Sequence, residues 1–346
     1  MEIIEIENLK NNFEMQKFFS LTKEIYEKDA IWHPENEEVI KQWFNFKTDA
    51  NEIRTWPVIA LDDEKEVLTR AVAILHSRAK NNKNQKVGWI GYFEAKKKQN
   101  DAVRKVLQYC QEIFQKNNVQ GIIAPRIDNL QQGIQINGFH FPQTIMTNYN
   151  PPYYYDYFKR NGYKDYRKII TIIFTRESYT ARDFQTKDIK IRHFNRQDLE
   201  KEIKIYHHLT NEIFSNRYDY IPRTFEETKN FVKSFLPFLD EELVIIAEDR
   251  NNNAIGYLIC IPDYYQSERE EQIDRARIIS IGVVPRYRKK KVAASMSSFL
   301  MRKLLEKGYQ SLEGAIIMKA NIPPQKLARK FGGKIGREYK LLRKKI

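Results

Sequence analysis

One stretch, residues 277–306, constrains the fold of this chain more than any other. The segment from Ile278 to Val284 is almost continuously apolar and rich in β-branched side chains, which predicts a buried strand. Pro285 cannot donate to a sheet ladder, so we expect the strand to end there. After a turn, apolar residues recur at helical spacing, and they are Val292, Met296, Phe299, Leu300 and Leu304. The stretch therefore predicts a strand, a tight loop and a helix in direct succession.

The loop within this stretch is strongly basic, because Arg288 is followed by Lys289, Lys290 and Lys291. The first turn of a helix presents unpaired backbone N–H groups and a partial positive charge, which together favour phosphate. The cationic side chains add full charges at the same place. The pattern indicates a phosphate-binding loop, and the alternative interpretation is a solvated basic turn in front of a core helix.

The bulk properties bound the class of protein. A chain of 346 residues is long for one hydrophobic core, so we expect two domains. No apolar run approaches a membrane span, and the acidic start has no signal-peptide pattern. Cys110 and Cys260 lie in apolar-periodic surroundings, which favours buried thiols over a disulfide. We therefore expect a cytoplasmic protein without a membrane span.

Periodicity predicts a similar order of elements in the two halves. In the first half, helices are expected at 14–28, 36–45 and 103–114 and from 151 onward, and strands at 57–61, 68–75, 87–93, 121–124, 144–148 and 169–174. In the second half, strands are expected at 189–194, 243–248, 255–261, 277–284 and 311–318 and at the basic C-terminal end, and helices at 197–209, 225–236, 291–306 and 324–331. Thr224 and Glu227 predict a capping box, and Gly332 suits a helix end that needs positive φ.

A repeat is also visible locally. Gly91 and Gly121 flank one predicted helix at a spacing of 30 residues, and Gly282 and Gly314 flank another at 32. The polar, aperiodic segment near 176–188 separates the halves. We therefore predict an N-terminal domain at 1–176, a linker at 177–188 and a C-terminal domain at 189–346.

The basic loop resembles motif A of the GNAT acyltransferases, whose pattern Arg/Gln-x-x-Gly-x-Gly/Ala binds the pyrophosphate of coenzyme A. The matching residues are Arg288, Lys289, Lys290, Lys291, Val292 and Ala293. Lys291 stands where the family has its central glycine, which lets the backbone approach a phosphate closely. The corresponding segment of the first half, Glu94–Asp101, lacks this pattern, so that half resembles a degenerate copy.

The whole chain is similar to a bacterial two-lobed GNAT-like family whose substrates are largely unassigned. The segments behind this resemblance are Gly138–Pro142, Tyr149–Tyr154, Tyr220–Thr224, Gly256–Asp263, Asn321–Pro324 and Lys330–Lys334. The resemblance implies an α/β (α+β) fold with two tandem GNAT-like domains. Each would have a mixed, mostly antiparallel central sheet flanked by helices.

The net charge of +14 lies in the last fifth of the chain. Residues 275–346 contain 20 Lys or Arg and three Asp or Glu, whereas the whole chain has 59 and 45. A localised positive field favours a polyanionic partner. Coenzyme A, RNA and an anionic membrane surface all qualify, and a merely solvated basic face is the simpler alternative.

The resemblance also implies roles for particular residues. An acetyl-CoA or other acyl-CoA donor would pair its pantetheine with the backbone at Ile281, Gly282 and Val283, and its pyrophosphate would bind residues 288–293. Asn321 matches the motif B asparagine near the pantetheine. Many family members have a tyrosine seven residues later as the acid for the thiolate, but here the position is Ala328.

Acyl transfer requires a deprotonated amine close to the thioester, so a carboxylate base is sought. Glu248 and Asp263 end neighbouring predicted strands and are the candidate bases, or else solvated strand-end carboxylates. Tyr218, Tyr220 and Arg223 lie in the helix–helix loop that usually shapes the acceptor pocket of this fold, although ordinary loop packing would also explain them. Histidines and cysteines do not occur at metal-ligand spacing, so no metal is expected.

Three functions are consistent with these patterns. The leading hypothesis is an acyl-CoA-dependent N-acyltransferase, most simply an acetyltransferase, acting on an unidentified small-molecule or peptide amine. The second is a non-catalytic tandem protein that binds acyl-CoA or a partner, because Lys291 and Ala328 depart from the family pattern. The third is an aminoacyl-tRNA-dependent transferase, which the basic C-terminal region permits but no recognisable RNA module favours.

Overall fold

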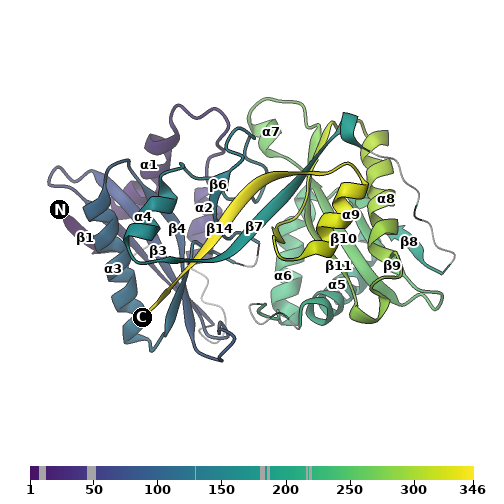
Figure 1. Ribbon diagram of the computed structural model, residues 1–346, viewed down its shortest axis with the longest axis horizontal. Helices are drawn as coiled ribbons and strands as arrows, with labels where there is room; N and C mark the ends of the chain where they lie inside the picture. Colours follow the sequence, from purple (N-terminus) through teal and green to yellow (C-terminus); the bar gives the residue numbers. More distant parts are fainter. Residues whose placement is uncertain are drawn as a thin grey trace. The chain divides into compact units, whose positions relative to one another are not determined.

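The structure is a computed structural model, and it describes residues 1–7, 13–44, 52–128, 130–179, 184, 188–215, 217 and 220–346. The chain divides into two compact units (Figure 1). Unit 1 comprises Met1–Ile169 and Arg337–Ile346, and unit 2 comprises Ile170–Gly336. The division falls within two long strands, β7 (Lys164–Thr175) and β14 (Lys334–Lys345). The domain limits predicted from the sequence, at 176 and 189, stay a prediction.

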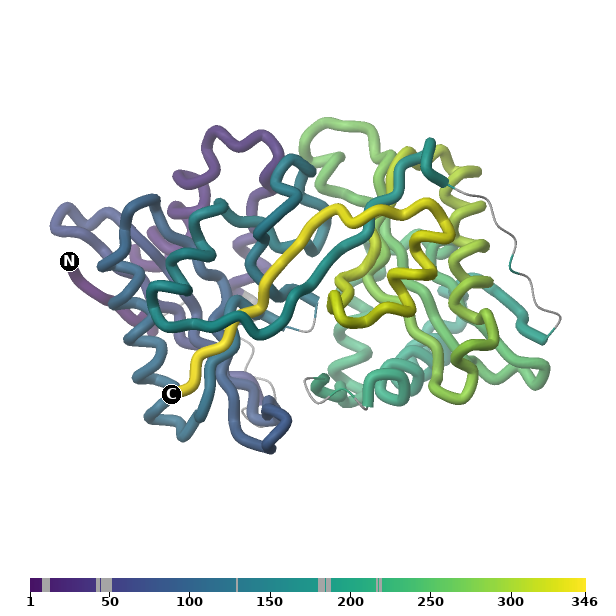
Figure 2. The backbone as a smooth tube through the Cα atoms, viewed as in Figure 1, coloured from purple at the N-terminus to yellow at the C-terminus, as the bar shows by residue number. Residues whose placement is uncertain are grey.

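Unit 1 is built on a sheet in the order β1-β2-β3-β4-β5-β14. Its other strands are β1 (Glu2–Glu5), β2 (Ile53–Leu61), β3 (Val67–His76), β4 (Val87–Ala95), β5 (Gly121–Ala124) and β6 (Ile134–Asn137), the last of which pairs with β14. Its helices are α1 (Phe13–Tyr26), α2 (Glu37–Phe44), α3 (Asn100–Lys116) and α4 (Tyr154–Arg160). β4 and β5 run parallel, and β14 runs antiparallel to β5. In Figure 2 the yellow C-terminal segment accordingly ends beside the blue part of the chain.

Alternation along β3 explains how helices cover both faces of this sheet. Ala71, Ala73 and Leu75 belong to the main hydrophobic core of unit 1, which includes side chains of α3 and α4. Arg70 points to the opposite face, where its guanidinium donates to the carbonyl of Phe18 in α1 at 2.7 Å. An apolar strand that is buried on both sides therefore lies between helices.

Unit 2 has a sheet in the order β7-β12-β11-β10-β9-β8. Its strands besides β7 are β8 (Lys190–His193), β9 (Val244–Glu248), β10 (Ala254–Pro262), β11 (Arg275–Val283), β12 (Ser311–Glu313) and the short β13 (Ile317–Met318). Its helices are α5 (Leu199–Phe214), α6 (Phe225–Phe235), α7 (Tyr265–Glu268), α8 (Val292–Glu306) and α9 (Ile322–Lys330). β11 and β12 run parallel, as a strand–helix–strand crossover through α8 requires.

Neighbouring residues of β10 show which helices cover each face of this sheet. A Cβ added at Gly256 would touch the side chain of Met296 in α8. The next side chain, Tyr257, packs edge-on against Tyr206 of α5, with ring centroids 5.2 Å apart. Helices α8 and α5 therefore lie on opposite faces. The predicted capping box at Thr224 and Glu227 is confirmed at the start of α6.

The mixed α/β architecture, in which helices flank the strands of each unit, confirms the predicted fold class. The strand predicted at 144–148 is wrong, because Thr147 N–H bonds back to the Thr144 carbonyl in a turn and Met146 has φ of +59°. The extended segment nearby is β6 instead. No helix in the described part of the chain is long and apolar enough to cross a membrane.

Candidate functional site

The parallel strands β11 and β12 stay paired over only three residues. Arg275–Arg277 pairs with Ser311–Glu313. Beyond Glu313 the chain stays paired with β7 on its other side, where the N–H of Gly314 donates to the carbonyl of Ile172 at 2.7 Å. Within the described ranges, the edge of β11 from Ile278 to Val283 has no strand partner on the β12 side. An extended ligand could pair with such an edge through its backbone groups. The predicted donor contacts Ile281, Gly282 and Val283 lie on this edge.

A β-bulge interrupts β11 beside the opening. Ile259 of β10 pairs with Ser280 and Cys260 pairs with Ile278, so Ile279 is the additional residue. Ile279 lines a cavity beneath α6, and the Ser280 hydroxyl lies 2.8 Å from the hydroxyl of Tyr257, which lines the same cavity. The bulge thus turns two successive side chains to the α5 and α6 side of the sheet, as bulges near functional sites commonly do.

The basic turn after β11 combines three lysines with a helix N-terminus. Lys289, Lys290 and Lys291 are exposed. Lys291 directly precedes α8, and the first turn of this helix has neither a side-chain cap nor an acidic residue. Its N–H groups and partial positive charge therefore face the same solvent as the ammonium groups. This arrangement suits a phosphate or pyrophosphate group.

Arg288 has a different function in this turn from the lysines. Its Nε donates to the carbonyl of Val283 at 3.2 Å and its Nη2 to the carbonyl of Ile213 at 3.1 Å. The side chain therefore fixes the turn to the ends of β11 and α5. Val292 is buried and Ala293 half-buried, so these two residues of the loop support it from beneath.

Lys291 adopts the backbone conformation for which glycine is suited, with φ of +62°. We expect Lys291→Gly to raise the free energy of unfolding by about 1 kcal/mol, because glycine reaches the left-handed region without a Cβ penalty. Urea denaturation of the two proteins measures this difference.

The matched control is Lys290→Gly, which removes the same charge from the neighbouring residue. Lys290 is not among the residues with positive φ, so glycine there should lower stability by about 0.5–1 kcal/mol. Equal destabilisation by both substitutions would contradict the conformational argument.

The loop between α5 and α6 is organised by one amide side chain. Asn211 accepts a hydrogen bond from the Tyr220 hydroxyl at 2.9 Å. It also donates to the carbonyl of Arg223 at 3.0 Å and accepts from the N–H of Arg223 at 3.3 Å. The Arg223 guanidinium lies 4.0 Å from the ring centroid of Phe231. Two of the predicted acceptor residues, Tyr220 and Arg223, therefore lie together, and the third, Tyr218, lies outside the described residues.

Tyr206 and Tyr257 complete this cluster, and no pattern in the sequence indicates them as site residues. Burial raises the pKa of both phenols above the ordinary value, and it raises the pKa of Tyr220 to about 12. All three hydroxyls therefore stay protonated near neutral pH and can act as hydrogen-bond donors. In the sequence, Tyr206 and Tyr257 both lie among regularly spaced apolar residues, as core tyrosines usually do. The hydrogen bond between the hydroxyls of Tyr257 and Ser280, which marks them as part of the site, is seen in the structure alone.

The two candidate bases lie at opposite ends of β10. Glu248 pairs with Ala254 at the start of the strand, whereas Asp263 follows its last residue, Pro262. Nine residues of strand separate positions by about 30 Å, so the two carboxylates cannot serve one centre. Each lies in an ion pair: Glu248 with Arg192 at 2.6 Å, and the fully buried Asp263 with Arg275 at 2.6 Å.

The remaining predicted residue, Asn321, lies at the N-terminus of α9. It is exposed, its side chain makes no capping hydrogen bond, and its carbonyl accepts from Nε2 of the buried Gln325 at 2.9 Å. Ala328 packs against the core of unit 2 and offers no hydroxyl at the position where a tyrosine was sought. In the described part of the chain no group of three or more metal-ligating side chains occurs.

Unit 1 repeats the diverging strand pair, but its own tyrosines fill the corresponding place. β4 pairs with β5 only at Val87–Trp89. At the end of β4, the hydroxyl of Tyr153 donates to the carbonyl of Ala95 at 3.0 Å, and the N–H of Ala95 donates to the hydroxyl of Tyr154 at 2.8 Å. In the following turn, the hydroxyl of Tyr157 donates to the carbonyl of Lys96 at 2.7 Å. These bonds occupy backbone groups that a ligand would need.

A buried carboxylate stabilises this arrangement in unit 1. Glu94 accepts hydrogen bonds from Tyr154 at 2.6 Å and from Tyr26 at 3.0 Å. Burial raises the pKa of Glu94 to about 7. The helix α4 is therefore fastened to the end of β4, unlike the open end of β11, although the exposed Lys97 and Lys98 also follow β4 as a basic turn.

Residues 204–333 match the family model described as the acetyltransferase (GNAT) family. Two solved structures cover nearly the whole chain. A GCN5-related N-acetyltransferase from Sphaerobacter thermophilus has 16% identity over 95% of this chain and 91% of its own, with a TM-score of 0.60. A tandem GNAT protein from the clavulanic acid biosynthesis pathway has 8% identity over 99% and 98%, with a TM-score of 0.66.

A third structure, a conserved protein of Enterococcus faecalis V583 described as a probable N-acyltransferase, has 11% identity and a TM-score of 0.59. It covers 100% of this chain and 72% of its own. We found no match among curated proteins. At these identities the likeness establishes the fold, including its tandem form.

Proposed function

We propose, from the match of residues 204–333 to the model of the GNAT acetyltransferase family, that unit 2 transfers an acyl group from acyl-CoA to an amine. The observation that supports this most strongly is the continuity of the open β11 edge with the basic turn and the start of α8. One segment thereby offers backbone pairing for a pantetheine arm and cations for a pyrophosphate.

In this proposal the donor lies along Ile281–Val283, and Lys289–Lys291 bind its pyrophosphate. The carbonyl of Val283 already accepts a hydrogen bond from Arg288, so the donor would pair with the other backbone groups of this edge. The exposed Asn321 at the start of α9 would add a polar contact to the pantetheine. Acetyl-CoA is the simplest donor of this class.

The reaction joins the amine nitrogen to the acyl carbon and breaks the carbon–sulfur bond. The nitrogen loses a proton, and the leaving thiolate gains one. An N–H group of β11 near the bulge would stabilise the oxyanion of the tetrahedral intermediate. Because Ala328 has no hydroxyl, we propose the hydroxyl pair of Ser280 and Tyr257 as the proton source for the thiolate.

Of the two carboxylates proposed as the base, Glu248 is the better candidate. It ends β9 beside the turn at Asp249, whose carboxylate accepts from the hydroxyl of Tyr287 in the basic turn at 2.7 Å. Asp263 is fully enclosed and bound to Arg275, which favours a structural role. The acceptor amine would enter along Tyr220 and Arg223, and Tyr218 is proposed to belong to the same loop.

The decisive experiment is calorimetric titration with acetyl-CoA, followed by detection of free thiol in the presence of a panel of small-molecule and peptide amines. We expect binding in the micromolar range, typical of enzyme substrates, and thiol release that depends on one amine class. No binding at millimolar donor would contradict the proposal. Cys110 and Cys260 are free and buried, which is compatible with the proposed cytoplasmic location.

Two alternatives make different predictions in the same assays. A non-catalytic acyl-CoA binder, favoured by Lys291 and Ala328, would bind the donor without thiol release from any amine. An aminoacyl-tRNA-dependent transferase would shift tRNA on a gel, and that shift would weaken steeply with salt.

A further inference from the structure

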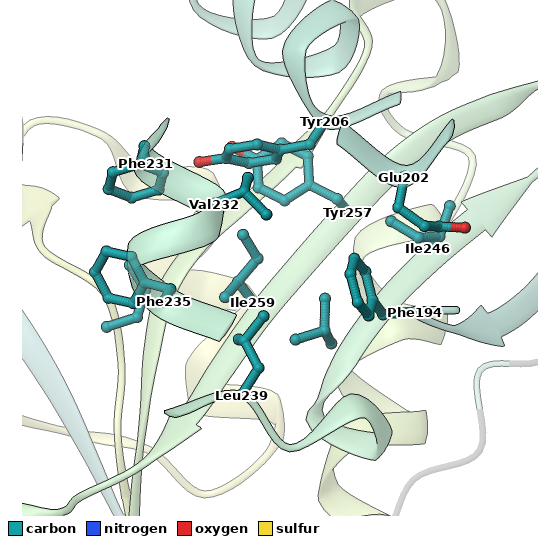
Figure 3. A pocket seen from close by; sticks show the side chains of 12 residues that line it. Phe194, Glu202, Tyr206, Phe231, Val232, Phe235, Leu239, Ile246, Tyr257 and Ile259 are labelled. Carbon is teal, nitrogen blue, oxygen red and sulfur yellow. The ribbon is translucent and has the colours of Figure 1, made fainter. Parts of the chain in front are cut away.

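A small apolar cavity lies between α6 and the sheet of unit 2 (Figure 3), and its volume is about 50 Å³. Phe231, Val232 and Phe235 of α6 line one side, and side chains of β9, β10 and β11 line the other. Glu202 also borders the cavity, but its carboxylate accepts a hydrogen bond from Arg192 at 2.8 Å. In Figure 3 the Glu202 oxygen accordingly points away from the other lining side chains. The lining is thus almost entirely hydrocarbon.

Helix α6, which lies above the cavity, is less buried than its amphipathic sequence pattern predicts. α6 is amphipathic, yet Thr228 is its only fully buried residue. Phe231, Val232 and Phe235 are only half-buried, although they face the sheet side of the helix. Apolar side chains at such positions normally pack into a core, and burying them on a ligand would remove further apolar surface from water.

Both ends of α6 are held by hydrogen bonds, which keeps the helix above the cavity. At its start, Asn211 binds both backbone groups of Arg223. After its end, the Arg196 guanidinium donates to the carbonyls of Leu236 and Leu239, each at 3.2 Å. The cavity is therefore enclosed by an anchored helix and not by a loose loop.

The cavity reaches the strand on which the donor is proposed to lie. Ile279, the additional residue of the β11 bulge, lines it, and the following residue is Ser280, which pairs with Tyr257. A group attached to the thioester carbon at the bulge would thus have direct access to the hydrocarbon lining. An ammonium group of an acceptor would meet mostly hydrocarbon in that lining, and the Glu202 carboxylate at its border is already paired with Arg192, so the amine is the less suitable occupant.

We propose that this cavity binds the distal carbons of an aliphatic acyl chain, so that the preferred donor carries a straight acyl group longer than acetyl. The inference rests on the proposed function. A volume of 50 Å³ corresponds to roughly two groups of the size of a water molecule, which selects a chain about two carbons longer, such as butyryl. In the transfer step the acyl carbon passes from sulfur to nitrogen as before, and the chain stays in place.

The test compares calorimetric affinities for CoA, acetyl-CoA, butyryl-CoA and decanoyl-CoA. Each buried methylene contributes about fourfold in affinity, so butyryl-CoA should bind roughly 15-fold more tightly than acetyl-CoA. The decanoyl chain exceeds the cavity, so decanoyl-CoA should bind no more tightly than butyryl-CoA. Val232→Phe fills the cavity and should reduce the butyryl-to-acetyl ratio from roughly 15 to about 1. The matched control, Val39→Phe, adds the same volume at an exposed position in unit 1 and should leave the ratio unchanged.

The outcomes separate the two proposals. Failure of every CoA species to bind would contradict the proposed function and this inference with it. Binding with equal affinity for acetyl and butyryl chains would overturn the inference alone, even if Val232→Phe did not fold. Hexylamine that raises the melting temperature of the wild type but not of Val232→Phe, together with equal acyl affinities, would assign the cavity to the acceptor and also overturn the inference.

Discussion

Replacing Lys289, Lys290 and Lys291 together by glutamate is expected to weaken acetyl-CoA binding by about 100-fold. The three ammonium groups are exposed beside the uncapped start of α8, where the proposal places the pyrophosphate. Reversing three charges at about 1 kcal/mol each corresponds to roughly two decades in the dissociation constant. Calorimetric titration at fixed ionic strength measures the change.

A matched triple substitution in unit 1 separates local contacts from the overall field. Lys83, Lys97 and Lys98 are also exposed lysines, and changing them to glutamate alters the net charge by the same amount. Lys97 and Lys98 lie in the turn of unit 1 that corresponds to the basic turn of unit 2. We expect less than a threefold effect. The opposite pattern, with a large loss only in the unit 1 variant, would place the donor in unit 1 and refute the assignment.

Gly332→Ala is expected to destabilise unit 2 by about 3 kcal/mol or more and to lower its melting temperature by roughly 10 °C. Gly332 has φ of +87°, and a Cβ there would overlap the carbonyl oxygen of Ser178. The oxygen belongs to the backbone, so relief requires the chain itself to move. Scanning calorimetry measures the shift.

Gly308→Ala provides the control, since Gly308 has a similar φ of +82° but no atom within 4 Å of the added carbon. This variant should lose only the conformational cost of about 1 kcal/mol. Equal losses for the two variants would show that crowding at Ser178 contributes nothing.

The sequence predicted the segment from β11 to α8 well because its signals are local. An apolar β-branched run, a proline, a basic turn and a helical repeat all act within thirty residues. The bulge at Ile279 could not be predicted, because it depends on the register with Cys260 in β10, and a regular strand would have the same composition. The sequence therefore does not predict which face of the sheet the side chains of Ile279 and Ser280 occupy.

Contacts between residues far apart in the sequence explain the other differences between the predictions and the structure. The predicted strand 311–318 forms two short strands, β12 and β13, and both pair with β7, far earlier in the chain. That division opens the edge of β11. The sequence predicts Glu248 and Asp263 as bases or solvated strand-end carboxylates, whereas in the structure they form ion pairs with Arg192 and Arg275. A pattern along the sequence predicts which elements form, and it does not show which charged side chains meet across a sheet.

The placement of residues 337–346 in unit 1 has a consequence for folding during synthesis. Strand β14 pairs with β5, yet it leaves the ribosome only after the whole of Ile170–Gly336. At translation rates of 5–20 residues per second, the delay is roughly 10–30 s. During that interval the nascent sheet of unit 1 exposes the β5 edge, a surface that is prone to mispairing until the last strand arrives.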